Sequence, residues 1–496
     1  AAASVGDPDA DHTSALMLCG EFLSGGFTDK TLDAIGGTAK DKGKNIFAQG
    51  LVARMFDLDA GRIEGLIVER FKGKPESITT TALSAFHAGN AYPMTTLAEI
   101  YEFEDPKARD SEQVVCNGNE ALGYGILAAG VRFGAGYPIT PWSDIMELLR
   151  RELPKYDGIF VQCEDEIAAV SMAIGASWGG RCAITGSSGP GIALKGEAIG
   201  WAVMAEIPLI VVDVQRGGPS TGMPTNVEQS DLNIACFGGH GDSPRVVLAP
   251  ASVEDCFYTA IEAVNIAREY STPVIILTDQ AIATRIEAFG MPNLKEVCQD
   301  ISPDLTPRED HKPYDLTAPD GKTQHAAPGT YIKSGKYPVV TGLEHNEMGH
   351  PSGSPQMHLD MNAKRRRKLQ ALGRALPKPE VFGPEEGNVL LVGWGSTQGS
   401  LREATERARK AGDSVSALTI RHINPLPEGL EDIFAGFNHV YVVENNDEGL
   451  YGYGQLCALL RAKYCDPKIE GINKTDGLTW RVKDVLARVA AKLEEK

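Results

Sequence analysis

The sequence has no pair of cysteines in a Cys-x-x-Cys spacing. Its nine cysteines are scattered at positions 19, 116, 163, 182, 236, 256, 298, 457 and 465. Iron–sulfur clusters and structural zinc ions are usually held by closely spaced cysteines, so this pattern argues against such a site on the chain. An odd number of widely spaced cysteines is typical of reduced thiols, and we therefore expect a cytoplasmic protein.

Positive charge is also scarce. Lys and Arg number 48 against 66 Asp and Glu, which gives a net charge of −18 and argues against non-specific nucleic-acid binding. No apolar run is long enough to cross a membrane. The first residues, AAASVGDPDADHTS, contain neither a basic region nor an apolar core, so we interpret residues 1–14 as a tail rather than a signal peptide.

Glycine and apolar residues are abundant. The 496 residues include 54 glycines, and 42% are hydrophobic, as expected for an α/β protein of roughly three or four domains. From Val114 onward, apolar strands alternate with helices. The expected strands are 158–164, 181–188, 207–216, 245–250 and 273–279. Strands that are apolar on both faces and separated by helices predict a doubly wound parallel sheet.

The remaining regions differ in composition. Residues 291–386 contain many prolines, histidines and charges but only one clear helix, the basic segment 362–372, and a connection this long is usually functional or wraps a partner. The strand and helix alternation returns from Gly387. We therefore divide the chain into a tail, a first α/β unit, the parallel-sheet domain, a connecting segment and a smaller α/β domain, at residues 1–14, 15–107, 114–290, 291–386 and 387–496.

The stretch GAGYPITPWSDIMELLRR places Thr140 between two prolines and before an amphipathic helix. Locally, Thr140 is a good helix N-cap, Pro141 suits the first helical position, and Asp144 suits the first turn. The same helix start, with its free N–H groups and a hydroxyl, is also an anion site that suits a carboxylate.

Three further loops are expected at the carboxyl ends of parallel strands, where open sheets bind ligands. The first, QCEDE, holds Glu164 and Glu166, which either serve helix electrostatics or face a cofactor nitrogen. The second, TGSSGPG at 185–191, is either a tightly packed turn or a phosphate cradle, although it lacks the Gly-Lys-Ser/Thr ending of a P-loop. The third opens with Arg216, which either pairs with a nearby acid or forks onto a carboxylate.

The stretch VGWGSTQGS at 392–400 resembles a dinucleotide fingerprint only loosely. Its glycine spacing is one residue too long, and no acidic residue ends the following strand. We therefore give nicotinamide binding little weight.

Together these motifs point to one family. GYPITP, CEDEIAA, TGSSGPG, VVDVQRGGPSTGMPT and NVEQSDL resemble the α subunit of 2-oxoacid:ferredoxin oxidoreductases, most strongly over residues 114–290. The resemblance implies an α/β fold with three parts: a γ-like α/β domain at 15–107, a doubly wound parallel-sheet pyrimidine-type thiamine domain, and a transketolase-C-terminal-like α/β domain from 387. The fused γ–α layout is most similar to enzymes that act on 2-oxoglutarate.

The resemblance also implies site roles. Glu166, with Glu164 as the fallback, is expected to bond the aminopyrimidine ring of thiamine diphosphate and favour the imino tautomer that deprotonates the thiazolium carbon. Thr140 and Arg216 are expected to contact the substrate. Thr221 is also expected at the substrate, and the other residues expected to bind the cofactor are Tyr137, Pro138, Ser188 and Gly189.

The chain departs from a complete enzyme of this family because it has neither a Gly-Asp-Gly motif nor a cysteine set for a cluster. In the family both lie on a β subunit, which binds the Mg²⁺ and diphosphate of thiamine diphosphate and carries a [4Fe-4S] cluster. The resemblance thus implies a dimer of αβ units that passes electrons to ferredoxin and the acyl group to coenzyme A.

Alternatives remain open from the residues alone. The substrate could be pyruvate or a branched-chain 2-oxoacid, because the extra cation that 2-oxoglutarate requires is not identified among His240, His345 and Lys195. A non-catalytic interaction subunit is the alternative from another class, although Thr140, Glu166 and Arg216 argue against it. The direction of the reaction is not indicated by the sequence.

Overall fold

The computed structural model describes residues 43–92, 112–299 and 301–494. Contacts divide the chain into two units, residues 1–110 and 111–496. Within the described residues, no helix combines the length and the apolar character needed to cross a bilayer.

The described part of the first unit consists of helices α3 (Lys44–Met55), α4 (Ala60–Arg70) and α5 (Glu76–Asn90). Helices α3 and α5 pack with their backbones in contact, because Gly50 lies against the carbonyl of Phe86 and Gly89 against the carbonyl of Phe47. No side chain larger than hydrogen fits at either glycine. The apolar segment ALMLCGEFLSGGF, part of the unit expected at 15–107, lies outside the described residues.

The second unit is built around a seven-stranded sheet in the order β12-β6-β7-β5-β4-β2-β3. Its strands are β2 (Phe133–Gly136), β3 (Ile159–Gln162), β4 (Ala183–Ser187), β5 (Leu209–Gln215), β6 (Val246–Leu248), β7 (Pro273–Asp279) and β12 (His422–Asn424). All neighbours pair in parallel except β12, which runs antiparallel to β6.

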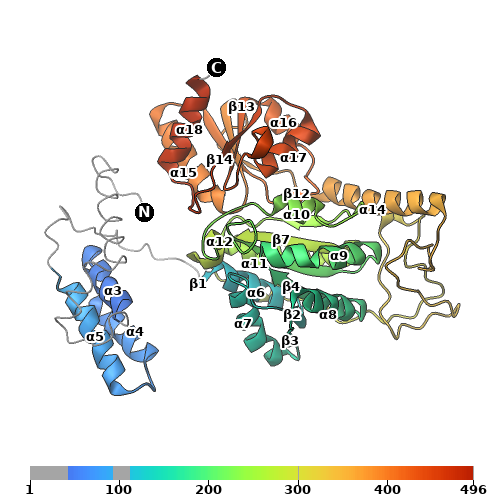
Figure 1. Ribbon diagram of the computed structural model, residues 1–496, viewed down its shortest axis with the longest axis horizontal. Helices are drawn as coiled ribbons and strands as arrows, with labels where there is room; N and C mark the ends of the chain where they lie inside the picture. The colour runs from blue at the N-terminus through green and yellow to red at the C-terminus, as the bar shows by residue number, and fades with distance from the viewer. Residues whose placement is uncertain (1–42, 93–111, 300, 495–496) are drawn as a thin grey trace. The chain divides into compact units, whose positions relative to one another are not determined.

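Helices cover both faces of this sheet (Figure 1). They are α6 (Gly118–Ala128), α7 (Ser143–Glu152), η1 (Leu153–Tyr156), α8 (Glu166–Trp178), α9 (Gly189–Met204), α10 (Leu232–Phe237), α11 (Val253–Tyr270) and α12 (Gln280–Thr284). Alternate residues of β5 enter different cores: Ile210 and Val212 pack with α6, α7 and α11, whereas Leu209 and Val211 pack with α8, α9 and α10. The predicted doubly wound sheet is confirmed.

A short antiparallel pair, β1 (Gln113–Asn117) with β8 (Ile286–Gly290), lies outside the main sheet and is followed by α13 (Leu294–Val297). The sequence pattern did not predict this pair, because its partners are far apart in the chain and neither is strongly apolar.

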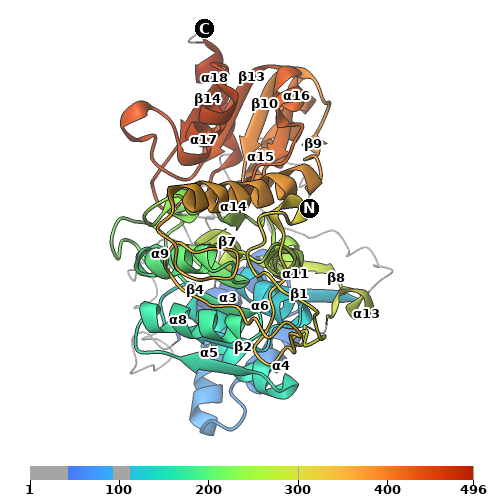
Figure 2. The same cartoon turned by 90° about the vertical axis from the view of Figure 1, so that its right-hand side faces the viewer.

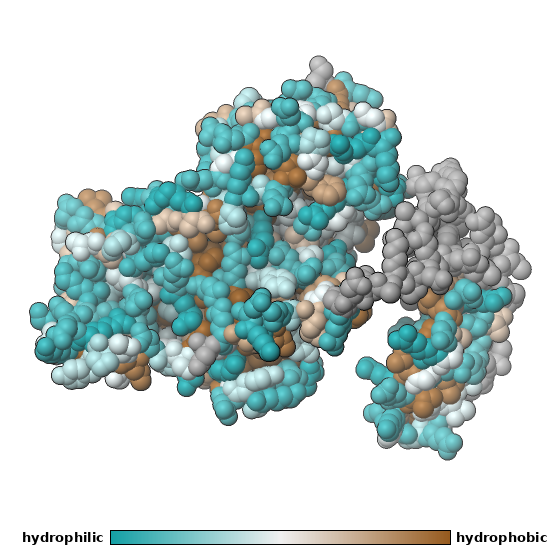
Figure 3. Space-filling model, turned by 180° about the vertical axis from the view of Figure 1, so that it is seen from behind, coloured by the Kyte–Doolittle hydropathy of each residue, from teal (hydrophilic) through white to brown (hydrophobic). Residues whose placement is uncertain are grey.

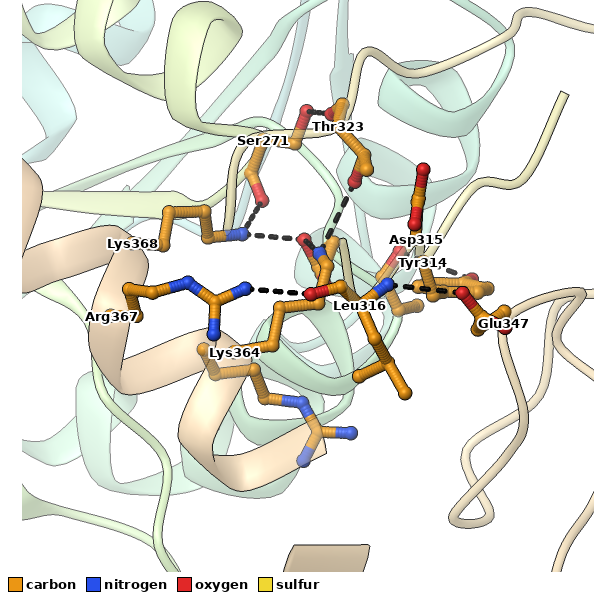
Figure 4. Close-up of polar contacts among 12 residues, drawn as sticks. Ser271, Tyr314, Asp315, Leu316, Thr323, Glu347, Lys364, Arg367 and Lys368 are labelled. Atoms are coloured by element: carbon orange, nitrogen blue, oxygen red, sulfur yellow. Dashed lines mark hydrogen bonds and ion pairs between the residues drawn. The ribbon is translucent and has the colours of Figure 1, made fainter. Parts of the chain in front are cut away.

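The connecting segment contains η2 (Pro319–Gly321), helix α14 (Pro355–Ala375) and β9 (Val381–Phe382). The predicted basic helix is confirmed and is longer than expected. Two of its lysines, Lys364 and Lys368, are buried, and Figure 4 shows both side chains extending from the helix. Lys364 Nζ lies 2.6 and 2.8 Å from the carboxylate oxygens of Glu206, and Lys368 Nζ lies 2.7 Å from Glu206 Oε2. Helix α14 therefore binds its own chain through a buried ionic cluster, at the end of α9.

The C-terminal sheet has the order β14-β13-β10-β11-β9. Its other elements are β10 (Gly387–Gly393), η3 (Gly395–Thr397), α15 (Gln398–Ala411), β11 (Val415–Thr419), α16 (Leu430–Ala435), β13 (Phe437–Glu444), η4 (Gly449–Tyr451), α17 (Gln455–Tyr464), β14 (Ile469–Asn473) and α18 (Val482–Glu494). All pairs are parallel except β11 with β9. The α/β alternation expected after Gly387 is confirmed.

The two sheets of the second unit are joined. Strand β12 leaves the C-terminal region and adds an edge to the first sheet, and Leu390 and Val392 of β10 belong to the same core as Val211 of β5. Helix α14 lies along the boundary between the sheets (Figure 2). On the face seen in Figure 3, hydrophilic residues dominate and hydrophobic ones form a few separate patches.

Candidate active site

The carboxyl ends of β2, β3, β4 and β5 lie at one edge of the sheet, because these strands are parallel neighbours. The four loops expected to carry the site leave the sheet at this edge. They are the loop after Gly136, the QCEDE loop, the loop after Ser187 and the loop that begins at Arg216.

Arg216 connects the first of these loops to the last. Its Nη1 donates to the backbone carbonyl of Thr140 at 2.7 Å, and its Nη2 donates to the carbonyl of Thr221 at 2.8 Å. The side chain is 7% exposed, and its Nε–H has no hydrogen-bond partner among the described residues. The sequence left open a salt bridge to a nearby acid, but the guanidinium bonds two backbone carbonyls and keeps N–H donors for a further acceptor.

The expectation that Thr140 caps a helix is wrong. Helix α7 begins at Ser143, its N-cap residue is Trp142, and no side chain bonds its first N–H groups. The Ser143 N–H donates instead to the carbonyl of Ile139 at 3.1 Å, so backbone turns satisfy the helix start. Pro141 is likewise outside the helix, whereas Asp144 lies in its first turn as expected. The Thr140 side chain is exposed and free for another contact.

The two glutamates of the QCEDE loop have different surroundings. Glu164 is exposed, whereas Glu166 is 7% exposed and is the first residue of α8. Asp165 between them caps the helix, accepting from the N–H of Ala168 at 2.7 Å. Helix capping is thus carried out by Asp165, which leaves the Glu166 carboxylate for another role.

Gly191 of α9 makes room for Glu166. A Cβ atom at Gly191 would lie 2.7 Å from Glu166 Oε1 and would also collide with Ser187 Oγ. Lys195, one helical turn further along α9 and fully buried, donates from Nζ to the backbone carbonyl of Glu166 at 3.0 Å. Burial lowers the pKa of Lys195 to about 8, although Glu166 and other nearby groups act in the opposite direction. A side chain of α9 therefore fixes the first residue of α8.

The TGSSGPG loop presents hydroxyl groups at the start of α9. Ser188 occupies the N-cap position but its side chain makes no capping bond, and the hydroxyls of Ser187 and Ser188 are buried with no partner among the described residues. Buried hydroxyls without partners are uncommon and call for a ligand, a water molecule or a proton-bearing neighbour. Gly189, the next residue, lies against the carboxylate of Asp231.

The remaining expected residues lie at the same edge of the sheet but are exposed to solvent. Tyr137, Pro138 and Thr221 are exposed. The contacts given above join Thr140, Arg216 and Thr221 as one group and Glu166 with Gly191 as another. No hydrogen bond described for this chain links the two groups.

The three side chains considered as cations for the second carboxylate of 2-oxoglutarate lie in different parts of the chain. Lys195 is buried behind Glu166. His345 is fully buried, its Nε2 lies 3.1 Å from the carbonyl of Met204 at the far end of α9, and it is therefore remote from the strand ends. His240 is exposed in the loop after α10.

Sequence reasoning missed Gln229, which joins this edge to the C-terminal sheet. Its backbone N–H donates to the carbonyl of Asn445 at 2.7 Å, its Oε1 accepts from the Asn445 N–H at 3.1 Å, and its Nε2 donates to the carbonyl of Trp394 at 2.8 Å. The residue is fully buried. The loop that begins at Arg216 is therefore fixed at its other end by the residue that follows β13 and the residue that precedes η3, a contact that only tertiary structure creates.

The sequence also gave Asp213 and Asp231 no role. Asp213 is a fully buried acid inside the apolar strand β5, and Asp231 closes the loop after it. The signal that could have found Asp213 is the run IVVDVQ, in which a charged residue interrupts a buried strand.

The turn GWGST uses one of its backbone N–H groups within the chain. The Ser396 N–H donates to Asp279 Oδ2 at 3.2 Å, so a carboxylate of the neighbouring sheet already occupies this turn.

Comparison with known proteins is consistent with this geometry. The family described as "Pyruvate flavodoxin/ferredoxin oxidoreductase, thiamine diP-bdg" matches residues 124–363, and "Pyruvate:ferredoxin oxidoreductase core domain II" matches residues 387–485. The 2-oxoglutarate oxidoreductase subunit KorA of Mycobacterium tuberculosis is 39% identical over 92% of this chain and 69% of its own length. The chain belongs to the α subunits of 2-oxoacid:ferredoxin oxidoreductases.

Two further relatives agree. The 2-oxoglutarate synthase subunit KorA of Methanocaldococcus jannaschii is 36% identical over 63% of this chain and 83% of its own length. Subunit alpha of 2-oxoacid:ferredoxin oxidoreductase 1 from Aeropyrum pernix is 34% identical over 80% of this chain, which spans 63% of that relative.

Among solved structures, the 2-oxoglutarate:ferredoxin oxidoreductase of Magnetococcus marinus, with 2-oxoglutarate, coenzyme A and succinyl-CoA bound, matches with a TM-score of 0.82 and 34% identity. The match covers 94% of this chain and 79% of that chain. The α subunit described here is therefore part of an enzyme with a thiamine-binding α/β fold.

The residues present at the strand ends fit thiamine diphosphate. A buried carboxylate at Glu166 and two unpartnered hydroxyls at Ser187 and Ser188 form an acceptor and donor set suited to an aminopyrimidine ring. The described residues contain no group of three or more His, Cys, Asp or Glu side chains arranged to hold a metal ion.

Proposed function

We propose that this chain is a fused γ–α subunit of a thiamine diphosphate-dependent 2-oxoglutarate:ferredoxin oxidoreductase. The enzyme interconverts 2-oxoglutarate and coenzyme A with succinyl-CoA and carbon dioxide, and ferredoxin is its electron partner. The observation that carries the proposal is the 39% identity, over 92% of the chain, with a 2-oxoglutarate oxidoreductase subunit. Likeness to an enzyme with 2-oxoglutarate, coenzyme A and succinyl-CoA bound supports the same substrates.

The fusion is supported by the extent of these matches. An alignment over 92% of the chain is longer than residues 111–496 alone supply, so it reaches into the first unit. The helices of residues 43–92 belong to that unit.

Thiamine diphosphate, when bound, supplies the nucleophilic carbon and the electron sink that 2-oxoacid decarboxylation requires. In our proposal the Glu166 carboxylate accepts a hydrogen bond from the aminopyrimidine ring and exchanges a proton with it. Glu166 is buried, and the Lys195 ammonium donates to its backbone carbonyl, which fixes the start of the helix that carries the carboxylate. Tyr137, Pro138, Ser188 and Gly189 are the other residues that would hold the cofactor.

Arg216 and Thr140 receive the substrate in this proposal. The guanidinium keeps donors that its two backbone bonds do not use, and a substrate carboxylate is the acceptor that suits it. Because Arg216 already binds the Thr140 carbonyl, the exposed Thr140 hydroxyl lies in the same part of the site. Thr221, which supplies the other carbonyl, completes this side.

The subunit is proposed to work with a β subunit that binds the Mg²⁺ and diphosphate of thiamine diphosphate and carries a [4Fe-4S] cluster. The proposed division follows the sequence, which has no Gly-Asp-Gly motif and no closely spaced set of cysteines. We further propose a dimer of αβ units in the cytoplasm.

A preference for pyruvate or a branched-chain 2-oxoacid is the second candidate. It is favoured by the lack of an assigned cation for the second carboxylate of 2-oxoglutarate, because Lys195 and His345 are both buried and bonded to backbone carbonyls.

The test is to co-express the chain with its β partner, measure thiamine and iron in the purified complex, and assay a panel of 2-oxoacids with coenzyme A and ferredoxin. We expect thiamine and iron in the complex only, and the highest kcat/KM for 2-oxoglutarate. Higher kcat/KM for pyruvate would select the second candidate. A complex without thiamine and without turnover of any 2-oxoacid would contradict both.

A further inference from the structure

Two neighbouring apolar side chains lie almost entirely in solvent. Leu450 is 97% exposed and Tyr451 is 87% exposed, whereas no other large apolar side chain of the described residues exceeds 69%. Single exposed apolar residues are ordinary on a protein surface, but an adjacent and fully presented pair is typical of an interaction site. We call residues 447–454, which carry the pair, the projecting loop.

The backbone of the projecting loop is held in a closed shape. The Tyr453 N–H donates to the carbonyl of Glu448 at 2.8 Å, across the pair. Gly449 and Gly452, on either side of the pair, have φ values of 61° and 74°, which residues with a side chain rarely adopt. The exposure of the pair is therefore a property of the folded loop.

Both ends of the projecting loop are bonded to the loop that begins at Arg216. Before it, Asn446 Nδ2 donates to the carbonyl of Gln229 at 2.9 Å. After it, Gln455 Nε2 donates to the carbonyl of Ser230 at 2.6 Å. The pair therefore projects from the margin of the site in which Arg216 is proposed to receive the substrate.

A second loop of the C-terminal region contacts the same segment and also carries an exposed apolar side chain. The carbonyl of Gly477 accepts from the N–H of Val227 at 3.0 Å, and Leu478, the next residue, is 54% exposed. We call Leu450, Tyr451 and Leu478 the docking surface. Its side chains come from two loops that both bond to residues 227–230.

We propose that the docking surface binds the β subunit and that the side chains of Leu450 and Tyr451 are buried in a pocket of that subunit. This chain has no Gly-Asp-Gly motif, so the subunit that supplies the motif has to cover the site at the strand ends. A subunit that covers this site meets the docking surface at its margin. Tyrosine is enriched among the residues that contribute most to binding, because its ring is large and its hydroxyl finds a partner. The inference rests on the proposed function.

The first experiment uses substitutions that leave the fold of the chain intact. Because Leu450 and Tyr451 contact little of their own chain, Leu450→Asp and Tyr451→Asp are expected to unfold at the same urea concentration as the wild type. In the complex co-expressed with the β subunit, each is expected to raise the dissociation constant about ten-fold or more, measured by sedimentation at a series of dilutions. An unchanged dissociation constant in both variants would overturn the proposal.

Leu359→Asp is the matched control for this experiment. Leu359 is 64% exposed and belongs to α14, which binds Glu206 at the end of α9 that is opposite the strand ends. We expect the dissociation constant of this variant to stay within about two-fold of the wild type, because the substituted side chain is equally accessible but distant from the site. A loss as large as that of Tyr451→Asp would overturn the assignment of the docking surface.

The second experiment identifies the molecule that covers the surface. Tyr451 is replaced by the photo-crosslinking amino acid p-benzoylphenylalanine, the complex is irradiated, and the adduct is identified by mass spectrometry. We expect an adduct between this chain and the β subunit, and none when the same replacement is made at Leu359. An adduct between two copies of this chain, or no adduct at position 451, would overturn the proposal.

These experiments separate the docking surface from the proposed function. A complex that contains thiamine and turns over 2-oxoglutarate, but whose dissociation constant is unchanged in Leu450→Asp and Tyr451→Asp, would overturn the docking surface and leave the proposed function standing. A wild-type chain that forms no complex with the β subunit would contradict both.

Discussion

Thr140 contributes two separate groups to the site. Its backbone carbonyl accepts from Arg216, and its side chain is exposed. A substitution that changes only the side chain therefore isolates the hydroxyl from the loop geometry. This separation was not foreseeable from the sequence, which suggested that the hydroxyl was used to cap a helix.

We expect Thr140→Val to lower kcat/KM about five-fold, since a hydrogen bond to the substrate contributes roughly 1 kcal/mol net. The free energy of unfolding should change by less than about 0.5 kcal/mol, because the exposed hydroxyl does not cap a helix. Steady-state kinetics and urea denaturation check both values, and Thr140→Ser, which keeps the hydroxyl, is the control. Unchanged kinetics in Thr140→Val would contradict a substrate contact.

Glu166 and Glu164 offer a matched comparison within one loop. Glu166→Gln should reduce kcat by about 100-fold or more, the usual contribution of a proton-transferring group, whereas Glu164→Gln should stay close to the wild type. The ultraviolet circular dichroism of bound thiamine, which reports the state of the aminopyrimidine ring, should change only in Glu166→Gln. The opposite ranking would assign the role to Glu164, the fallback in the sequence analysis.

At the scale of elements, the long connecting segment is anchored by Glu206. This residue lies just after α9, is 3% exposed, and binds the ammonium groups of Lys364 and Lys368 from α14. Lys368 also donates to the carbonyl of Ser271, and Lys364 to the hydroxyl of Thr323 (Figure 4). The basic helix in an acidic chain is therefore explained by an internal partner.

We expect Glu206→Gln to destabilise the chain by about 3–5 kcal/mol, because it leaves two buried cations without their counter-ion. Glu269→Gln, which breaks the largely exposed pair with Lys322, should cost less than about 1 kcal/mol. Guanidinium denaturation of the two variants measures the difference. Equal and small losses would show that α14 is held by its apolar contacts alone.

The same cluster responds to acid. Burial by itself raises the pKa of Glu206, but the ammonium groups of Lys368 and Lys364 outweigh burial and lower it overall. A carboxylate with a lowered pKa contributes stability above its unfolded value of about 4.5, and this stability is lost as the pH falls through the folded value.

At the scale of the whole molecule, the pKa values of several buried acids are raised, which is opposite to the shift of Glu206. Burial is the main cause that raises the pKa values of Asp213, Asp231, Asp279 and Glu444. The native state then binds more protons than the unfolded state above about pH 4, so stability falls as the pH rises through the folded values. For Asp231 this window extends to about pH 7.

We therefore expect the free energy of unfolding to decrease between about pH 5 and about pH 8, and the decrease to be smaller in Asp213→Asn. Denaturant titrations at a series of pH values measure this slope. A slope that is unchanged in Asp213→Asn would show that Asp213 is already ionised in the native protein.

The sequence by itself determined the local features of this protein. Alternating apolar runs and glycine loops specified the parallel strands from 158 to 279, and the motifs around Thr140, Glu166 and Arg216 specified the family, because these signals depend on neighbouring residues in the chain. Tertiary structure alone decided which atoms meet. The bonds of Arg216 to backbone carbonyls, the contacts of Gln229 with residues beside the C-terminal sheet and the pairing of the basic helix with Glu206 join residues that are distant in sequence or use groups common to every residue. Local pattern carries no information about such contacts, since they arise only when strands and loops assemble.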